Sequence, residues 1–155
     1  PPMSADEQKE AFESALTSAL ADSCRLEVVQ AIHEQLREKI EAHRENKDPA
    51  APSVTAGEVE DILLRQGVSE EEASAFRAQC QERFGENAVL NPENLIDSKR
   101  FQVKAGEVTV SVDPASSYLV ETRMIDGVKY LLIPSGNAVE VNGLPVSVGG
   151  EAPEE

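Results

Sequence analysis

Two histidines and two cysteines are the residues of this chain whose types could bind a metal ion. His33 and His43 lie ten residues apart in a segment that predicts a helix, so their side chains point about 80° apart, with roughly 15 Å between them along the axis. One ion cannot bind both, so we expect the two histidines to lie at the helix surface or at the seam with a neighbouring helix. Cys24 and Cys80 also lie in helical segments, outside any Cys-x-x-Cys pair. Because a structural zinc site normally needs about four such ligands, the sequence predicts no metal ion, no cofactor and no disulfide framework.

A nucleophile activated by a neighbouring base is the other chemistry that the residue types allow. Ser116 and Ser117 would need such a base, and the sequence identifies no histidine partner for them. Glu121 and Arg123 share one face of an expected strand, and Lys129 lies on the other face. An exposed charge pair of this kind contributes less than about 1 kcal/mol. The sequence therefore predicts no catalytic residue and favours a non-enzyme.

The segment 55–85 has the outline of a helix-turn-helix, with two short helices that meet at Gly67. A recognition helix reads DNA with its N-terminal end, where this chain has three consecutive glutamates at 70–72. These carboxylates would repel phosphates, and they have a simpler role in stabilising the helix dipole. The formal net charge of −15 would also repel a polyanion. A structural helical hairpin is therefore expected, without direct nucleic-acid binding by this chain.

Capping residues and apolar spacing place the helices. Ser4, Thr55 and Ser69 are each followed three residues later by glutamate, the pattern of a capping box. Apolar residues recur at helical spacing in residues 4–22, and a second helix is expected to begin after a cap at Asp22-Ser23. The apolar stripe expected on this second helix is Val29, Ile32, Leu36, Ile40 and His43.

The pattern changes to alternation in the C-terminal part, which predicts half-buried strands. Asp126-Gly127 and Asn142-Gly143 are expected two-residue hairpin turns. The expected fold is α+β, with N-terminal helical hairpins followed by a C-terminal antiparallel β-meander, in which about five strands form one sheet with helices over one face. The expected parts are a helical hairpin at 1–45, a linker at 46–54, a second helical hairpin at 55–90, an antiparallel sheet at 91–148 and a disordered tail at 149–155.

Five segments carry a family resemblance. They are 24–34, 82–85 and, above all, 119–123 with 125–127 and 140–143, the last three reading Leu-Val-Glu-Thr-Arg, Ile-Asp-Gly and Glu-Val-Asn-Gly. Together they resemble the C-terminal region of the bacterial domain of unknown function 4317 family. The resemblance implies a bacterial origin and a longer protein whose N-terminal part lies outside this chain, and it brings no known activity or catalytic residue. In architecture alone, the chain is also similar to the C-terminal part of bacterial 37-kilodalton nucleoid-associated proteins.

These observations favour a non-catalytic structural or protein-interaction module, the C-terminal part of a larger bacterial cytoplasmic protein. The apolar runs are too short to span a bilayer, and Pro1-Pro2-Met3 lacks the basic start of a signal peptide. A cytoplasmic location, no membrane contact, and a protein partner or self-association are expected. Two alternatives stay open. One is a nucleoid-associated or nucleic-acid-linked protein whose binding surface lies in the N-terminal region, and the other is an enzyme whose active site is completed by residues outside this chain.

The charge of the chain leads to the first prediction. The chain will show no measurable affinity for duplex DNA or RNA near physiological salt, because 14 basic residues against 29 acidic ones offer no surface for releasing counterions. Fluorescence anisotropy with labelled duplexes measures this directly. Micromolar binding that weakens steeply as salt rises would contradict the prediction and reveal a local basic patch.

Overall fold

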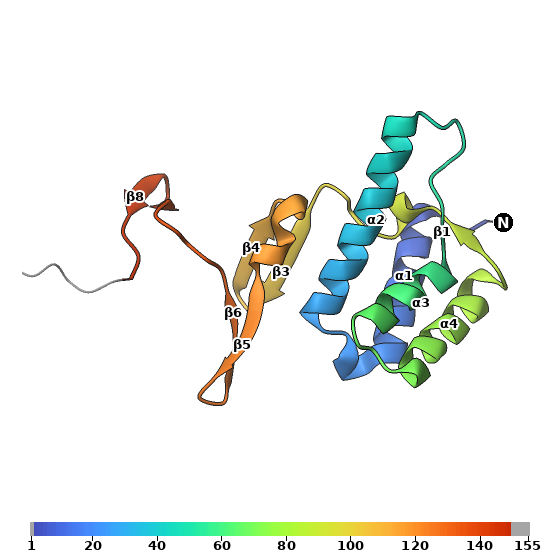
Figure 1. Cartoon of the computed structure of the whole chain (residues 1–155), viewed down its shortest axis with the longest axis horizontal. Coiled ribbons are helices and arrows are strands. Elements are labelled where there is room, and N and C mark those ends of the chain that lie inside the picture. The colour runs from blue at the N-terminus through green and yellow to red at the C-terminus, as the bar shows by residue number, and fades with distance from the viewer. Residues whose placement is uncertain (1, 150–155) are drawn as a thin grey trace, which may run out of the picture. The chain divides into compact units, whose positions relative to one another are not determined.

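A computed structural model describes residues 2–149 of the chain. Helices occupy its N-terminal half and antiparallel strand pairs follow them (Figure 1), so the predicted α+β fold is confirmed. The chain divides into two units, Pro1–Ser117, which we call the helical unit, and Tyr118–Glu155. Apart from Gly149, the predicted tail at 149–155 lies outside the described residues. The α-helices are α1 (Ala5–Leu20), α2 (Leu26–Asn46), α3 (Ala56–Arg65) and α4 (Glu70–Phe84).

Side-chain caps fix where three of the helices begin, as predicted. The Ser4 hydroxyl accepts a hydrogen bond from the Glu7 N–H at 3.2 Å, and the Glu7 carboxylate accepts one from the Ser4 N–H at 3.3 Å. Helix α1 therefore opens with a complete capping box. Thr55 and Ser69 likewise accept from the N–H group three residues later, at the starts of α3 and α4. Each cap satisfies a donor that the helix cannot pair internally.

The start of α2 differs from the prediction of a cap at Asp22-Ser23. Residues Ala21–Ser23 form a short 3-10 helix, η1, which closes with a hydrogen bond from the Cys24 N–H to its first carbonyl at 3.0 Å. These residues belong to that turn and cannot cap α2. Arg25 takes the N-cap position without a side-chain capping bond. Its guanidinium instead donates to the Gln66 carbonyl at 2.9 Å, which ties the start of α2 to the end of α3.

The core of the helical unit is aliphatic around two phenylalanine rings. Phe12 of α1 and Phe76 of α4 meet edge to face, with ring centroids 6.1 Å apart and planes at 84°. The chain has no Trp and only four Phe, so smaller apolar side chains must fill the remaining space. Side chains from all four helices join this cluster, among them Leu20, Val28, Leu36, Leu63 and Ala73.

Helix α2 buries a slightly different stripe from the predicted one. Val29 is 38% exposed, and Val28 is buried in its place. Val28 begins a series of buried residues spaced by four, which follows one side of a helix. His33 is buried beside this series, because its ring contacts the segment 97–101. The buried residues of α2 are Val28, Ile32, His33, Leu36 and Ile40.

Two short strands that the sequence patterns did not indicate also belong to the helical unit. β1 (Val54–Thr55) precedes α3 and pairs antiparallel with β2 (Val89–Leu90), which follows α4. Val54 and Leu90 lie opposite each other, and both are buried. The last residue of the predicted linker at 46–54 therefore contributes to the core.

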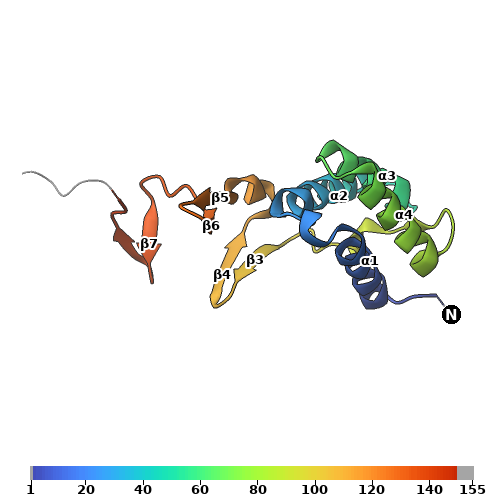
Figure 2. The same cartoon turned by 90° about the horizontal axis from the view of Figure 1, so that it is seen from below.

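Three hairpins follow a short 3-10 helix, η2 (Pro92–Asn94). β3 (Phe101–Ala105) pairs with β4 (Val108–Val112), and Figure 2 shows this pair extending as an arm from the helices. β5 (Glu121–Ile125) pairs with β6 (Val128–Leu132), and β7 (Val139–Val141) pairs with β8 (Leu144–Val146).

Both predicted hairpin turns are confirmed. Asp126 and Gly127 have φ of 49° and 80°, and Asn142 and Gly143 have φ of 51° and 85°, the positive values that a type I′ turn requires at both central positions. The Asp126-Gly127 turn sets the register of β5 and β6, in which Met124 lies opposite Lys129 as predicted.

The predicted single sheet of about five strands, covered on one face by helices, is wrong. Within residues 2–149 each strand of the three hairpins pairs only with its hairpin partner, and β1 with β2 makes a fourth two-stranded sheet. The connections explain this separation. A 3-10 helix, η3 (Pro114–Leu119), lies between β4 and β5, and six residues that include Pro134 lie between β6 and β7. Neither connection is a tight turn of the kind that sets consecutive hairpins side by side.

The central ring leads to a prediction about stability. Phe76 is fully buried against Phe12, so Phe76→Ala should lower the free energy of unfolding by about 3–5 kcal/mol. Urea unfolding followed by circular dichroism measures this loss. Leu64→Ala, at a helix position that is 39% exposed, is the control and should cost much less. Similar losses for the two variants would mean that Phe76 does not anchor the core.

Candidate functional site

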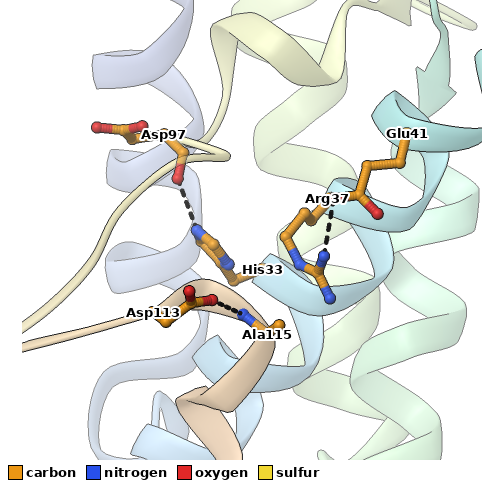
Figure 3. A network of polar contacts seen from close by, with 6 residues as sticks. All are labelled: His33, Arg37, Glu41, Asp97, Asp113 and Ala115. Carbon is orange, nitrogen blue, oxygen red and sulfur yellow. Dashed lines mark hydrogen bonds and ion pairs between the residues drawn. The ribbon is translucent and has the colours of Figure 1, made fainter. Parts of the chain in front are cut away.

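A histidine on α2 contacts the base of the β3–β4 arm. His33 is 7% exposed, and its Nε2 lies 2.7 Å from the backbone carbonyl oxygen of Asp97, in the loop before β3. A carbonyl oxygen can only accept, so Nε2 carries the proton and donates it. Figure 3 shows the imidazole extending from α2 toward this loop. The Phe101 ring of β3 packs edge-on against the imidazole, with 5.2 Å between the ring centroids.

A second donor lies one turn earlier on α2. Gln30 Nε2 donates to the backbone carbonyl oxygen of Ser117 at 2.8 Å, and Ser117 is buried. Asp97 precedes β3 and Ser117 follows β4, so the two carbonyl groups mark the two ends of the arm. Helix α2 therefore holds both ends of the arm with side chains three residues apart.

Two buried nitrogen atoms of this site make no hydrogen bond within the described residues. They are Nδ1 of His33 and Nε of Arg37, on consecutive turns of α2. Arg37 is paired with Glu41 through its Nη1 at 2.9 Å (Figure 3). In a neutral imidazole with its proton on Nε2, Nδ1 is an acceptor, whereas the Arg37 Nε is a donor. The site therefore holds one acceptor and one donor on the same side of the helix.

A cavity of about 470 Å³ lies beside His33, between α1, α2 and the segment 95–102. Lys9 and Arg100 bring positive charge to it, and Glu13 and Asp97 bring negative charge, so it favours neither an anion nor a cation. None of its lining residues is a serine, threonine or cysteine. The arrangement can accept an apolar group and offers no hydroxyl or thiol nucleophile. Its apolar lining is Phe12, Leu16, Val29, Ile32, Leu95, Ile96 and Phe101.

A second cavity, of about 270 Å³, lies between the start of α3 and the end of α4, and Cys80 lines it. Cys80 is 2% exposed. Burial raises the pKa of its thiol to about 11, although Arg77 and Arg83 act in the opposite direction. The thiol therefore stays protonated near neutral pH and is a poor nucleophile. Cys24 and Cys80 are both free, and burial raises the pKa of the Cys24 thiol as well.

The two histidines of α2 contact separate backbone carbonyl groups. Nε2 of His43 bonds the carbonyl of Ala50, whereas Nε2 of His33 bonds that of Asp97. Each ring is therefore held by a different loop, which is typical of a structural contact. Within residues 2–149, no group of three or more His, Cys, Asp and Glu side chains is placed to hold a metal ion.

A family model matches nearly the whole chain. It is described as a domain of unknown function, DUF4317, and it covers residues 1–144. The chain belongs to this family. The family resemblance of the sequence is thus confirmed, while no curated protein and no solved structure matches this DUF4317 chain significantly. No helix in the part of the chain that the structure describes is long and apolar enough to cross a membrane.

The segment 55–85 of the DUF4317 chain forms a tight helical hairpin. Helix α3 ends in a Schellman motif, in which the Val68 N–H donates to the Leu63 carbonyl at 3.0 Å and Gly67 has a φ of 84°. The glutamates at 70–72 form the first turn of α4. Hydrogen bonds from the Ser23 and Ser69 hydroxyls hold the pKa of the Glu72 carboxyl below its ordinary value. These contacts stabilise the first turn of α4.

The other residues that the sequence analysis considered either contribute backbone atoms to contacts or lie at the surface. The Ser116 N–H donates to the Asp113 carbonyl at 2.8 Å, within the turn that opens η3. Glu121 and Arg123 are exposed on one face of β5, and Lys129 lies on the opposite face. Ser117 enters the α2 site through its carbonyl oxygen. The sequence analysis considered His33 as a metal ligand and Ser117 as a nucleophile and favoured neither role, and it missed Gln30 and Asp97.

The Asp97 contact leads to a prediction about His33. His33→Leu keeps the apolar bulk but removes the donor from a part-buried carbonyl, so the free energy of unfolding should fall by about 1–3 kcal/mol. His33→Gln is the matched control, because its amide N–H can lie near the position of Nε2 and should restore much of the loss. Urea unfolding compares the two. If leucine is tolerated as well as glutamine, the hydrogen bond contributes nothing to stability.

Proposed function

We propose that this DUF4317 chain is a non-catalytic protein-interaction module that contacts its partners through exposed apolar side chains of its β-hairpins. One observation carries the proposal. Of the 14 large hydrophobic side chains that are exposed among the described residues, 11 lie between Val108 and Val148. Single exposed apolar residues are ordinary, but their concentration in one part of a chain is typical of a surface that binds other proteins.

Both faces of the β5–β6 hairpin carry exposed apolar side chains. The register places Met124 on one face, and Ile125, Val128 and Tyr130 on the other. Val120 is the one buried side chain among residues 118–149. A two-stranded hairpin that buries so little gains little stability from its own side chains. A protein partner would supply the missing burial.

The β3–β4 arm is amphipathic and continues the same pattern. Its apolar face begins at Phe101, which is buried against His33, and ends at Val108, which is 60% exposed at the tip. The alternating residues on the other face are all polar. An apolar stripe therefore leads from the core of the helical unit to solvent. The residues of this stripe are Phe101, Val103, Ala105, Val108, Val110 and Val112.

Both units are acidic. Residues 1–117 contain 12 basic and 23 acidic side chains, and residues 118–155 contain two basic and six acidic ones. An excess of acidic residues supports solubility. This composition suits the C-terminal part of a larger bacterial cytoplasmic protein, which is the setting that we propose for the module.

The proposal predicts that binding depends on hairpin side chains. A protein that co-purifies with the chain is itself purified and titrated against variants by isothermal titration calorimetry. Ile125→Lys and Tyr130→Lys should each raise the Kd at least about tenfold, because they place a charge in an apolar contact.

Val89→Lys and Leu64→Lys are the matched controls for that titration. They change exposed apolar residues of the helical unit and should leave the Kd unchanged. Loss of binding in these two variants alone, or the lack of any protein that binds the purified chain, would contradict the proposal.

A further inference from the structure

The turn between β7 and β8 contains the only Asn-Gly pair of the sequence, Asn142-Gly143. In such a pair the backbone nitrogen of the glycine can attack the side-chain amide carbon of the asparagine, because a glycine has no Cβ to obstruct the approach. Both residues are exposed, and within residues 2–149 a Cβ built on Gly143 would meet no atom within 4 Å. The other asparagines all precede larger residues, and they are Asn46, Asn87, Asn91, Asn94 and Asn137.

The closed turn holds the two reacting atoms apart. Asn142 has a φ of 51°, as the first central residue of a type I′ turn requires. Such a turn is the mirror image of type I, so the ψ of this residue is about +30°. At that ψ the Gly143 nitrogen lies nearly anti to the Asn142 Cβ about the Cα–C bond, away from the side chain. The nitrogen must rotate toward the side chain before it can attack, so the reaction requires the turn to open.

Few contacts hold the β7–β8 hairpin closed. The two-residue turn makes Val141 and Leu144 a hydrogen-bonded pair, and these side chains are 55% and 66% exposed. The next pair, Glu140 with Pro145, exchanges no hydrogen bond, in keeping with the missing N–H of proline. The ladder has three residue pairs, whereas the β5–β6 ladder has five. Because isolated two-stranded hairpins are marginally stable, the Asn142-Gly143 turn opens readily.

We propose that Asn142 is a site of spontaneous deamidation, and that its isoaspartyl product permanently unpairs β7 from β8. The Gly143 nitrogen loses its proton and forms a bond to Cγ of Asn142, while the amide nitrogen takes up a proton and leaves as ammonia. Water then opens the resulting cyclic imide at one of its two carbonyl carbons. Cleavage of the bond to Cγ gives aspartate on a normal backbone, and cleavage of the bond to the backbone carbonyl carbon gives isoaspartate. Water is the only other reactant.

The two products differ in their effect on the hairpin. Isoaspartate carries the main chain through Cβ and Cγ, which lengthens the turn by a methylene group and leaves the former backbone carbonyl as a carboxylate. A type I′ turn needs defined dihedral angles at both central residues, so the longer main chain no longer places Val141 opposite Leu144. The aspartyl product keeps the turn, because Asp-Gly also favours type I′, as Asp126-Gly127 does in the β5–β6 hairpin.

Peptide mapping by mass spectrometry tests the modification on the whole chain. During incubation in mildly alkaline buffer, conversion of amide to acid should be at least about tenfold faster at Asn142 than at Asn137, because alanine obstructs the attacking nitrogen where glycine does not. Asn137 is a matched internal control, since it is also exposed and lies five residues earlier in the same unit. Conversion at Asn142 should be faster still in guanidinium chloride, where the turn is always open.

Nuclear magnetic resonance tests the structural consequence. Ion exchange separates the modified chains, because each carries an additional negative charge. In a non-hydrogen-bonded pair the two Cα atoms are closest, so an Overhauser contact between the Hα atoms of Glu140 and Pro145 reports the closed hairpin. The contact should be present in the unmodified chain and absent from the isoaspartyl chain. Asn142→Asp is the matched control, because it adds the same charge on a normal backbone and should keep the contact.

Three results would overturn the proposal. The first is a folded chain that shows no conversion at Asn142 while the chain in guanidinium chloride converts fully, because the hairpin would then stay closed. The second is an equal rate in the folded and unfolded chains, because the turn would then not hold the Gly143 nitrogen away from the side chain. The third is an isoaspartyl chain that keeps the contact between Glu140 and Pro145.

Discussion

The edge-to-face contact between Phe12 and Phe76 is the interaction on which the helical unit depends. It joins two helices that are far apart in the sequence, and the chain has no Trp and few other aromatic rings to replace it. Helices α2 and α3 bury their apolar stripes in the same cluster. This packing fixes which side of α2 faces the core, and therefore which side presents Gln30 and His33 to the arm.

Much of the fold could be predicted because it follows from short-range signals. Ser4, Thr55 and Ser69 cap helices through contacts three residues away, and Asp126-Gly127 fixes a hairpin through the φ of two adjacent residues. The cap predicted for α2 was wrong because two neighbouring signals compete. Asp22 and Ser23 are good capping residues, but a 3-10 turn incorporates them first. The single sheet failed because pairing between hairpins depends on connections that alternation does not describe.

The contacts of Gln30 and His33 with the two ends of the arm could not be predicted, since they join residues far apart in the sequence. Gln30 and Ser117 are 87 residues apart, and His33 and Asp97 are 64 apart. In both pairs the acceptor is a backbone carbonyl, which every residue has, so no side-chain pattern marks it. His33 gave a partial signal, as a histidine beside the apolar stripe of α2. A residue of that type at a helix seam indicates a polar contact without naming the partner.

The attachment of the arm at both ends has an evolutionary consequence. Because Gln30 and His33 hold the segments before β3 and after β4, the chain between them begins and ends at fixed points on one helix. Its tip at Gly106 and Glu107 is exposed and remote from those points. Lengthening a loop whose ends are already fixed adds only a small entropic cost. Related chains can therefore vary the length and residues of this tip while the helical unit stays the same.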